Sequence, residues 1–126
     1  MILVDTDVLV HHLRGSAAAT RWLLERRAEA PLTISAVTVA EITGGMRADE
    51  RRETWRLLAA FRVESATDGI ARLAGGLRRE YRASHSGIGI ADYLIAATAT
   101  VLGYELATLN VRHFPMFPGL VAPFRP

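Results

Sequence analysis

The chain has 126 residues, of which half are hydrophobic, and its formal net charge is +2. This length and composition exclude a disordered protein and favour one domain, residues 1–126, with a proper core. Cysteine is absent, which excludes disulfides, thiolate zinc sites and cysteine nucleophiles and fits a reducing compartment. All fifteen basic residues are arginine, so enzymes that need an active-site lysine, such as P-loop NTPases and Schiff-base enzymes, are excluded.

Neither a secretion signal nor a membrane span is expected. The first residues lack the basic region of a signal peptide, and the apolar run that starts at Ile2 breaks at Asp5. The longest apolar stretch, residues 88–106, is interrupted by Asp92 and Glu105. We therefore expect a soluble, cytoplasmic protein with no membrane partner.

Short strand-like stretches alternate with helical segments along the chain. Residues 2–4 form a wholly apolar run typical of a buried parallel strand, and three further short strands are predicted at residues 31–34, 61–64 and 105–108. The intervening segments predict helices at residues 5–13, 17–28, 35–46, 49–60, 67–83 and 91–102. This alternation is typical of an α/β fold with a small parallel sheet of four to five strands flanked by helices.

Two of these helices carry further expectations. In the charged helix 49–60, the apolar residues Trp55, Leu58 and Ala59 are expected to anchor it to the core. Helix 91–102 is almost wholly apolar, so we expect it to be buried on all sides.

Polar side chains come after three of the predicted strands. Asp5, Ser35 and Asn110 stand at or just after strand ends, and ligands of such folds gather beyond the carboxyl ends of the strands. Asp5 has a structural alternative, because a junction between a strand and a helix favours aspartate as an N-cap. Asp7 is interpreted as a cap or as a supporting group, and Asn110 as a possible turn residue.

Two more acids stand in apolar helices. Glu41 lies in the middle of its helix, where no capping role exists, so it is either functional or exposed on a narrow polar stripe with Thr38 and Gly45. Asp92 begins the most apolar helix, where the helix dipole favours an acid and a cap is the alternative. If Asp5, Glu41 and Asp92 converge, their charges repel unless a cation lies among them. Oxygen ligands of this kind suit Mg²⁺ and the hydrolysis of a phosphodiester.

Four stretches together resemble the PIN domain, and within it the VapC-type toxins of bacterial toxin–antitoxin pairs. They are Val4–Leu9, Ile34–Ile42, Ile90–Ala99 and Leu106–Phe114, and their order and the chain length agree with that family over nearly the whole chain. The resemblance implies a single PIN-like domain and a ribonuclease that depends on Mg²⁺, or alternatively on Mn²⁺. It implies an RNA substrate, a cognate antitoxin and a homodimer.

The resemblance also implies roles for individual residues. Asp5, Glu41 and Asp92 match the acids that coordinate metal and carry catalysis. Thr6, Ser35 and Thr108 match positions that support the site. Many relatives have a further aspartate where Asn110 or His113 stands here, so Asn110 is expected to bind metal without charge, and we favour a single metal ion.

Other functions stay open on the sequence alone. A PIN-like module could bind RNA or protein without cutting, and a PIN ribonuclease could serve RNA processing without an antitoxin. Asp5-Thr6-Asp7 also resembles the nucleophile motif of haloacid-dehalogenase-type phosphatases and the acidic site of phosphoacceptor receiver domains. Both of those families usually need a lysine, which this chain lacks.

Overall fold

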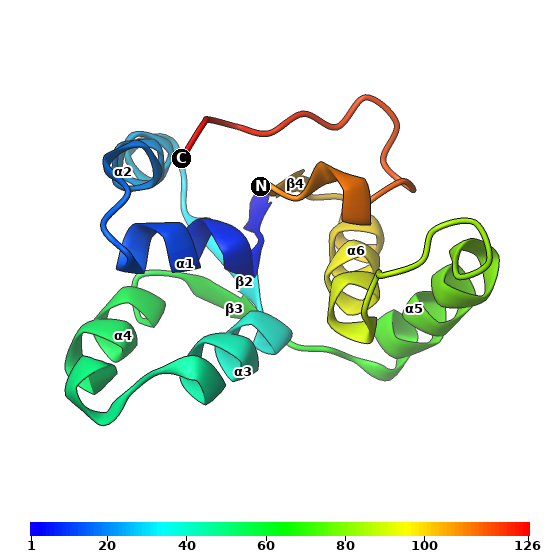
Figure 1. Cartoon of the computed structure of the whole chain (residues 1–126), viewed down its shortest axis with the longest axis horizontal. Helices are drawn as coiled ribbons and strands as arrows, with labels where there is room; N and C mark the ends of the chain where they lie inside the picture. Colours follow the sequence, from blue (N-terminus) through cyan, green and yellow to red (C-terminus); the bar gives the residue numbers. More distant parts are fainter.

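The structure, a computed structural model, describes all residues from 1 to 126. Four parallel strands form one sheet in the order β3-β2-β1-β4 (Figure 1). The strands are β1 (Ile2–Val4), β2 (Leu32–Ser35), β3 (Arg62–Glu64) and β4 (Glu105–Ala107). The α-helices are α1 (Thr6–Leu13), α2 (Ala17–Glu29), α3 (Ala36–Gly45), α4 (Arg51–Leu58), α5 (Asp68–Tyr81) and α6 (Ile90–Leu102). Two 3-10 turns, η1 (Ala48–Glu50) and η2 (Val111–His113), complete the chain, and the predicted α/β fold is confirmed.

The two central strands, β1 and β2, are the most deeply buried. Ile2 of β1 pairs with Leu32 of β2 on one side and with Glu105 of β4 on the other. Every residue of β2 is buried, which is the burial expected of a parallel strand covered on both faces. The sequence shows this as a continuous apolar run only in β1, whereas β2 alternates apolar residues with the buried hydroxyl residues Thr33 and Ser35.

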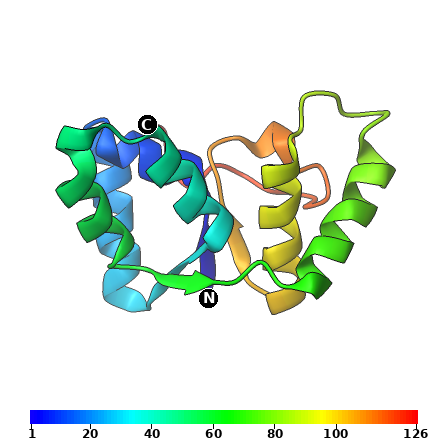
Figure 2. The same ribbon diagram turned by 90° about the horizontal axis from the view of Figure 1, so that it is seen from below.

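Helices cover both faces of this sheet. Val4 packs into a core cluster with residues from α1, α2, α3 and α4, whereas its neighbour Leu3 packs against α6 and β4. This division results from the period of two in a strand, since successive side chains point to opposite faces. In Figure 2 the helices α1 to α4 lie on one side of the molecule, and α5 and α6 lie on the other.

The helices begin where the sequence offers a capping oxygen. Ser16, Ser35 and Thr67 each accept a hydrogen bond from a backbone N–H in the first turn of the next helix. Asp5 does the same for α1. Helix α6 differs, because Gly89 precedes it without a capping side chain and Gly103 ends it in the left-handed conformation.

Of the expected anchors of α4 only Leu58 is confirmed, and the expected burial of α6 on all sides is wrong. Trp55 is 45% exposed and Ala59 is exposed, whereas Thr54 and Leu58 are buried, because α4 turns this pair rather than the tryptophan toward the core. Helix α6 is not buried on all sides, since Ile90 and Val101 are each 53% exposed. It packs against the sheet and α5, which leaves part of its surface facing solvent.

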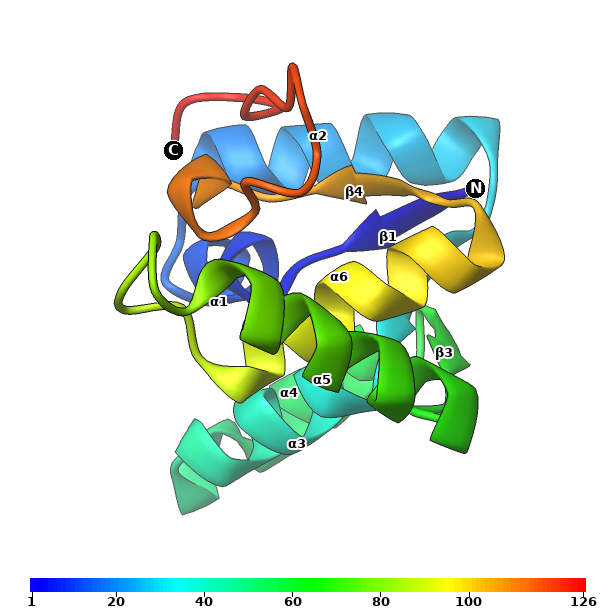
Figure 3. The same cartoon turned by 90° about the vertical axis from the view of Figure 1, so that its right-hand side faces the viewer.

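The residues after η2 cross the molecule back toward the first helices (Figures 1 and 3). Near the end of this tail, Phe124 packs on Trp22 of α2, with ring centroids 5.9 Å apart. The tail therefore joins the α6 side of the molecule to α2. Among the helices, none has the length and apolar character needed to cross a membrane.

The same substitution, glycine to alanine, should change the free energy of unfolding in opposite directions at two positions. Gly103 has φ of +69°, so Gly103→Ala should lower the free energy of unfolding by about 1–2 kcal/mol. Gly76 lies inside α5 with open space around its Cα, so Gly76→Ala should raise it by about 0.5–1 kcal/mol. Urea denaturation of both variants measures these changes in the free energy of unfolding. Changes of the same sign in the two variants would contradict the left-handed conformation of Gly103 or the helical conformation of Gly76.

Candidate functional site

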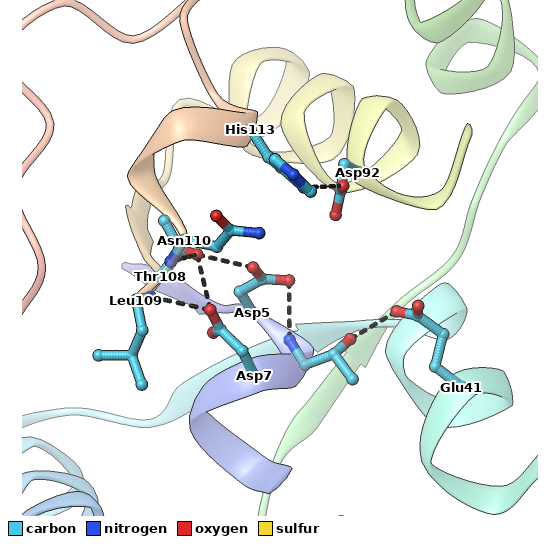
Figure 4. Close-up of polar contacts among 9 residues, drawn as sticks. Asp5, Asp7, Glu41, Asp92, Thr108, Leu109, Asn110 and His113 are labelled. Carbon is cyan, nitrogen blue, oxygen red and sulfur yellow. Dashed lines mark hydrogen bonds and ion pairs between the residues drawn. The ribbon is translucent and has the colours of Figure 1, made fainter. Parts of the chain in front are cut away.

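Four acids line one edge of the sheet. Asp5 comes directly after β1, and Thr108 directly after β4, so both lie at the carboxyl ends of parallel strands. Helix α6 is joined to the start of β4 by only Gly103 and Tyr104, and it therefore begins near this same edge with Asp92 in its first turn. Figure 4 shows Asp5, Asp7, Glu41 and Asp92 around one opening, as the sequence predicts for three of the four.

Asp5 is 4% exposed and is held from several directions. Its backbone N–H donates to Ala107 O over 2.9 Å, which extends the pairing of β1 with β4. Its Oδ1 accepts from the Thr6 N–H over 2.8 Å, and its Oδ2 accepts from the Thr108 hydroxyl over 2.7 Å. Asp5 is therefore both the N-cap of α1 and a residue of the site, so its capping role does not exclude a functional one.

Asp7 belongs to the site and is not the cap of α1. Its Oδ2 accepts from the Leu109 N–H over 3.0 Å and lies 3.2 Å from the Thr108 hydroxyl. Its Oδ1 is buried and has no hydrogen-bond partner. The sequence could not separate Asp5 from Asp7, because either side chain at this junction is able to cap the helix.

The charges of these two acids, of which Asp5 is buried and Asp7 is partly buried, are not balanced by a cation of the protein. Neither Asp5 nor Asp7 takes part in a salt bridge. Burial, and then the charge of Asp7, raise the pKa of Asp5 from 3.8 to about 7, although hydrogen bonds from Thr108 and Thr6 oppose this rise. Burial also raises the pKa of Asp7. A positive charge at this edge would therefore be strongly favoured.

Glu41 reaches the site from α3. Its carboxylate is exposed to solvent, but its Oε1 accepts from the Thr6 hydroxyl over 2.6 Å. That hydroxyl also lies 3.0 Å from the hydroxyl of the buried Thr38. Thr6 thus connects the Glu41 carboxylate to α1, which favours the functional interpretation of Glu41 over a free surface glutamate.

Asp92 is paired with His113, which the sequence analysis names only as a position where relatives carry an aspartate, and not as a partner of Asp92. His113 Nδ1 lies 2.8 Å from Asp92 Oδ2, and both side chains are partly exposed. The pair depends on η2 docking beside the first turn of α6, as Figure 4 shows. A separation of 21 residues gives no periodic signal, so only the tertiary structure brings the two together.

The predicted supporting residues differ in their positions. Thr108 is buried and bridges Asp5 and Asp7, and the Asn110 N–H donates to its hydroxyl over 3.1 Å. The side chain of Asn110 is exposed at the opening of the site. Ser35 instead accepts from the Val37 N–H over 3.0 Å as the cap of α3, and it does not line the cavity at the acids.

The acids surround a cavity of about 440 Å³ that is open to solvent. It is lined by Asp5, Thr6, Asp7, Val10, His11, Arg14, Glu41, Asp92, Asn110 and His113. Sequence reasoning missed His11 and Arg14 as lining residues. The available signal was their spacing, since Asp7, His11 and Arg14 recur on one face of α1.

The donor chemistry of this cavity fits a hard divalent cation. Carboxylate oxygens are the ligands that Mg²⁺ and Mn²⁺ prefer, and a cation would balance the charge of Asp5 and pair with the orphaned Oδ1 of Asp7. No three His, Asp or Glu side chains already form a group that could hold a metal ion. The fit therefore lies in charge and donor type rather than in a preassembled cluster.

Comparisons with known proteins identify the family of this chain. The model of the PIN domain family matches residues 2–116. Ribonuclease VapC10 of Mycobacterium tuberculosis is 62% identical over 124 residues, covering 98% of this chain and 93% of the relative. Ribonuclease VapC19 of the same organism is 43% identical over 125 residues, covering 98% of this chain and all of the relative.

A solved structure shares the fold as well. A chain of a toxin–antitoxin complex from Klebsiella pneumoniae superposes with a TM-score of 0.81 at 29% identity, with 98% of each chain covered. The family match and both mycobacterial relatives extend over almost the whole length of the present chain. The chain belongs to the PIN domain family.

Proposed function

We propose that this protein is a metal-dependent endoribonuclease that acts as the toxin of a VapBC-type toxin–antitoxin pair. The observation that carries the proposal is the buried Asp5 beside the partly buried Asp7, a pair of acids whose charge no basic side chain balances. They lie in an open cavity with Glu41 and Asp92. The names of the mycobacterial relatives, which are ribonucleases, support the same reaction class.

Asp5, Glu41 and Asp92 are the proposed metal ligands, and Asn110 is a proposed neutral ligand through its amide oxygen. A divalent cation held there would supply Lewis-acid stabilisation of the charge on the phosphoryl oxygens. Mg²⁺ is the proposed ion, with Mn²⁺ as the alternative. Thr6 would keep the Glu41 carboxylate in place through its hydrogen bond, and Thr108 would do the same for Asp5.

The free carboxylate oxygens are suited to handle the attacking water. Glu41 Oε2 and Asp92 Oδ1 make no hydrogen bond within the protein. It is the other oxygen of each carboxylate that bonds to a neighbour, Glu41 Oε1 to the Thr6 hydroxyl and Asp92 Oδ2 to His113 Nδ1. In the proposed step, water attacks the phosphorus as the bond between phosphorus and the leaving ribose oxygen breaks. One of these two oxygens orients the water and accepts its proton, and the leaving ribose oxygen takes a proton from solvent. Both residues line the cavity where the substrate would enter.

The proposed partners rest on the comparisons. The structural relative from Klebsiella pneumoniae is part of a toxin–antitoxin complex, which supports an antitoxin as the partner of this chain. The expected homodimer and the cytoplasmic location remain predictions.

The first experiment measures cleavage of a mixed RNA pool by the wild type with Mg²⁺, with Mn²⁺ and with EDTA. Asp5→Asn should lower the rate by at least about a hundredfold, since loss of even a supporting partner of a metal ligand usually costs about 10–100-fold. Asp49→Asn removes an equal charge at an exposed site and should leave the rate unchanged. Folded wild type that cuts with neither metal would favour a binding module without catalysis.

The raised pKa of Asp5 predicts how metal binding depends on pH. In the folded protein Asp5 keeps its proton up to about pH 7, whereas in the unfolded chain it loses the proton near pH 3.8. The contribution of Asp5 to the stability of the metal-free protein is therefore fully present below pH 3.8. It is lost as the pH rises through 7. A cation favours the ionised form. The rise in Tm caused by Mn²⁺ should therefore be larger at about pH 8 than at about pH 5.5.

The control for this measurement is Asp5→Asn, which cannot titrate. In EDTA its Tm should exceed that of the wild type at about pH 8, and the difference should shrink toward about pH 5.5. An Mn²⁺ effect that is equal at both values, or larger at the acidic one, would contradict the role of Asp5.

A toxin differs from an RNA-processing enzyme in its effect on growth. Induced expression of the wild type in a bacterial host should arrest growth, and Asp5→Asn should relieve the arrest because cleavage is lost. Co-expression of a small gene encoded beside this one should also restore growth. An active ribonuclease whose expression leaves growth unchanged would point to a processing role without an antitoxin.

A further inference from the structure

The cavity at the acids lies beside a second cavity of about 410 Å³. The two share three lining residues, Val10, Arg14 and Glu41. The second cavity extends between α1, α3 and α4 as far as η1, and we refer to it as the α1–α3 groove. Its lining residues are Val10, Leu13, Arg14, Glu41, Ile42, Gly45, Met46, Arg47, Glu50, Glu53 and Thr54. A substrate bound at the acids could therefore extend from the acid cavity into this groove.

Arg14 stands at the junction of the two cavities. It comes directly after the last residue of α1, and it lies on the same helical face as Asp7 and His11, at spacings of seven and three residues. Its side chain is exposed and makes no salt bridge and no hydrogen bond. Arg47, at the far end of the groove, is instead close to Asp49 and Glu50.

The charges at this junction decide what Arg14 can bind. RNA is a polyanion, and a cavity lined by four carboxylates repels its phosphates except at the one that a cation neutralises. Arg14 is the single arginine that lines the acid cavity. A guanidinium binds phosphate oxygens through two parallel hydrogen bonds, and an arginine without a protein partner is free to do so.

The remaining wall of the groove suits a nucleobase better than a phosphate. Leu13, Ile42 and Met46 provide apolar surface there, whereas Glu50 and Glu53 would repel a phosphate. Single-stranded RNA presents unstacked bases that proteins take up on such surfaces. The phosphate of this nucleotide would then stay at the Arg14 end of the groove.

We propose that Arg14 binds the phosphate next to the one that is cleaved, and that the α1–α3 groove takes the adjoining base of a single-stranded RNA. This inference rests on the proposed ribonuclease function. It makes Arg14 a substrate-binding residue, separate from the acids that would hold the metal.

The test compares Arg14→Gln with the wild type and with Arg21→Gln. Arg21 is an exposed arginine of α2 that makes no salt bridge and lines neither cavity, so it controls for the loss of one positive charge. The measurement is kcat/KM for a short single-stranded RNA with Mn²⁺ across a series of KCl concentrations. Arg14→Lys is included because it keeps the charge and loses the paired hydrogen bonds.

Arg14→Gln should lower kcat/KM about ten- to a hundredfold, as expected for the loss of hydrogen bonds to a charged group. It should also reduce the slope of log kcat/KM against log salt by about 0.7, the value for one contact to a single strand. Arg14→Lys should keep the slope and lose part of the rate. Arg21→Gln should change neither quantity.

A readout without RNA separates Arg14 from the metal site. The Mn²⁺-induced rise in Tm should be the same in Arg14→Gln as in the wild type, and a lost rise would overturn the inference because Arg14 would then act through the acids. If the wild type cuts RNA and Arg14→Gln behaves like Arg21→Gln, the inference is overturned while the ribonuclease stands. A wild type that does not cut RNA overturns both.

Discussion

The buried carboxylate of Asp5 is the point at which the elements of this protein meet. Its backbone extends β1 beside β4, one of its oxygens caps α1, and the other accepts from Thr108 after β4. Desolvation of a carboxylate is unfavourable, and here the hydrogen bonds from Thr6 and Thr108 offset it only in part, since the pKa of Asp5 remains raised. The fold therefore keeps the carboxyl group of Asp5 at a place where its ionised form is unfavourable.

This arrangement lowers the stability of the metal-free protein and favours the binding of a cation. A structural carboxylate is usually paired with a cation of the protein, as Asp68 is paired with Arg72 on α5. At the carboxyl edge of the sheet the buried Asp5 and the partly buried Asp7 lack such a partner, and the arginine that lines their cavity is exposed to solvent. Attraction for an external cation and attraction for a substrate phosphate are thereby kept on separate side chains.

The positions of Asp5, Glu41 and Asp92 could be predicted from the sequence because each depends on a local rule. Apolar runs locate the parallel strands, and the residue after each parallel strand lies at the same edge of the sheet. An acid inside an apolar helix needs a reason, which identifies Glu41. The PIN resemblance joined these separate signals, and the family match confirms it.

The features that the sequence did not reveal depend on contacts between distant segments. His113 reaches Asp92 only because η2 docks beside α6, and Asp7 becomes a site residue only because Leu109 offers it a backbone N–H. Trp55 faces solvent because the rotation of α4 is set by the packing of Thr54 and Leu58. Hydrophobicity and capping preferences describe each helix alone, so they do not determine which of its faces meets its neighbours.

The hydrogen bond between Thr108 and Asp5 joins residues 103 positions apart, and this bears on how the protein is made. The chain emerges from the ribosome with its N-terminus first. β1 and the aspartates that follow it are therefore made long before β4. Until β4 is available, β1 lacks the neighbour that flanks it on that side, and Asp5 lacks the hydroxyl that holds it. The acidic site can thus assemble only after β4 has been synthesised. A nascent chain that ends before β4 carries Asp5 and Asp7 without the contacts that hold them in place.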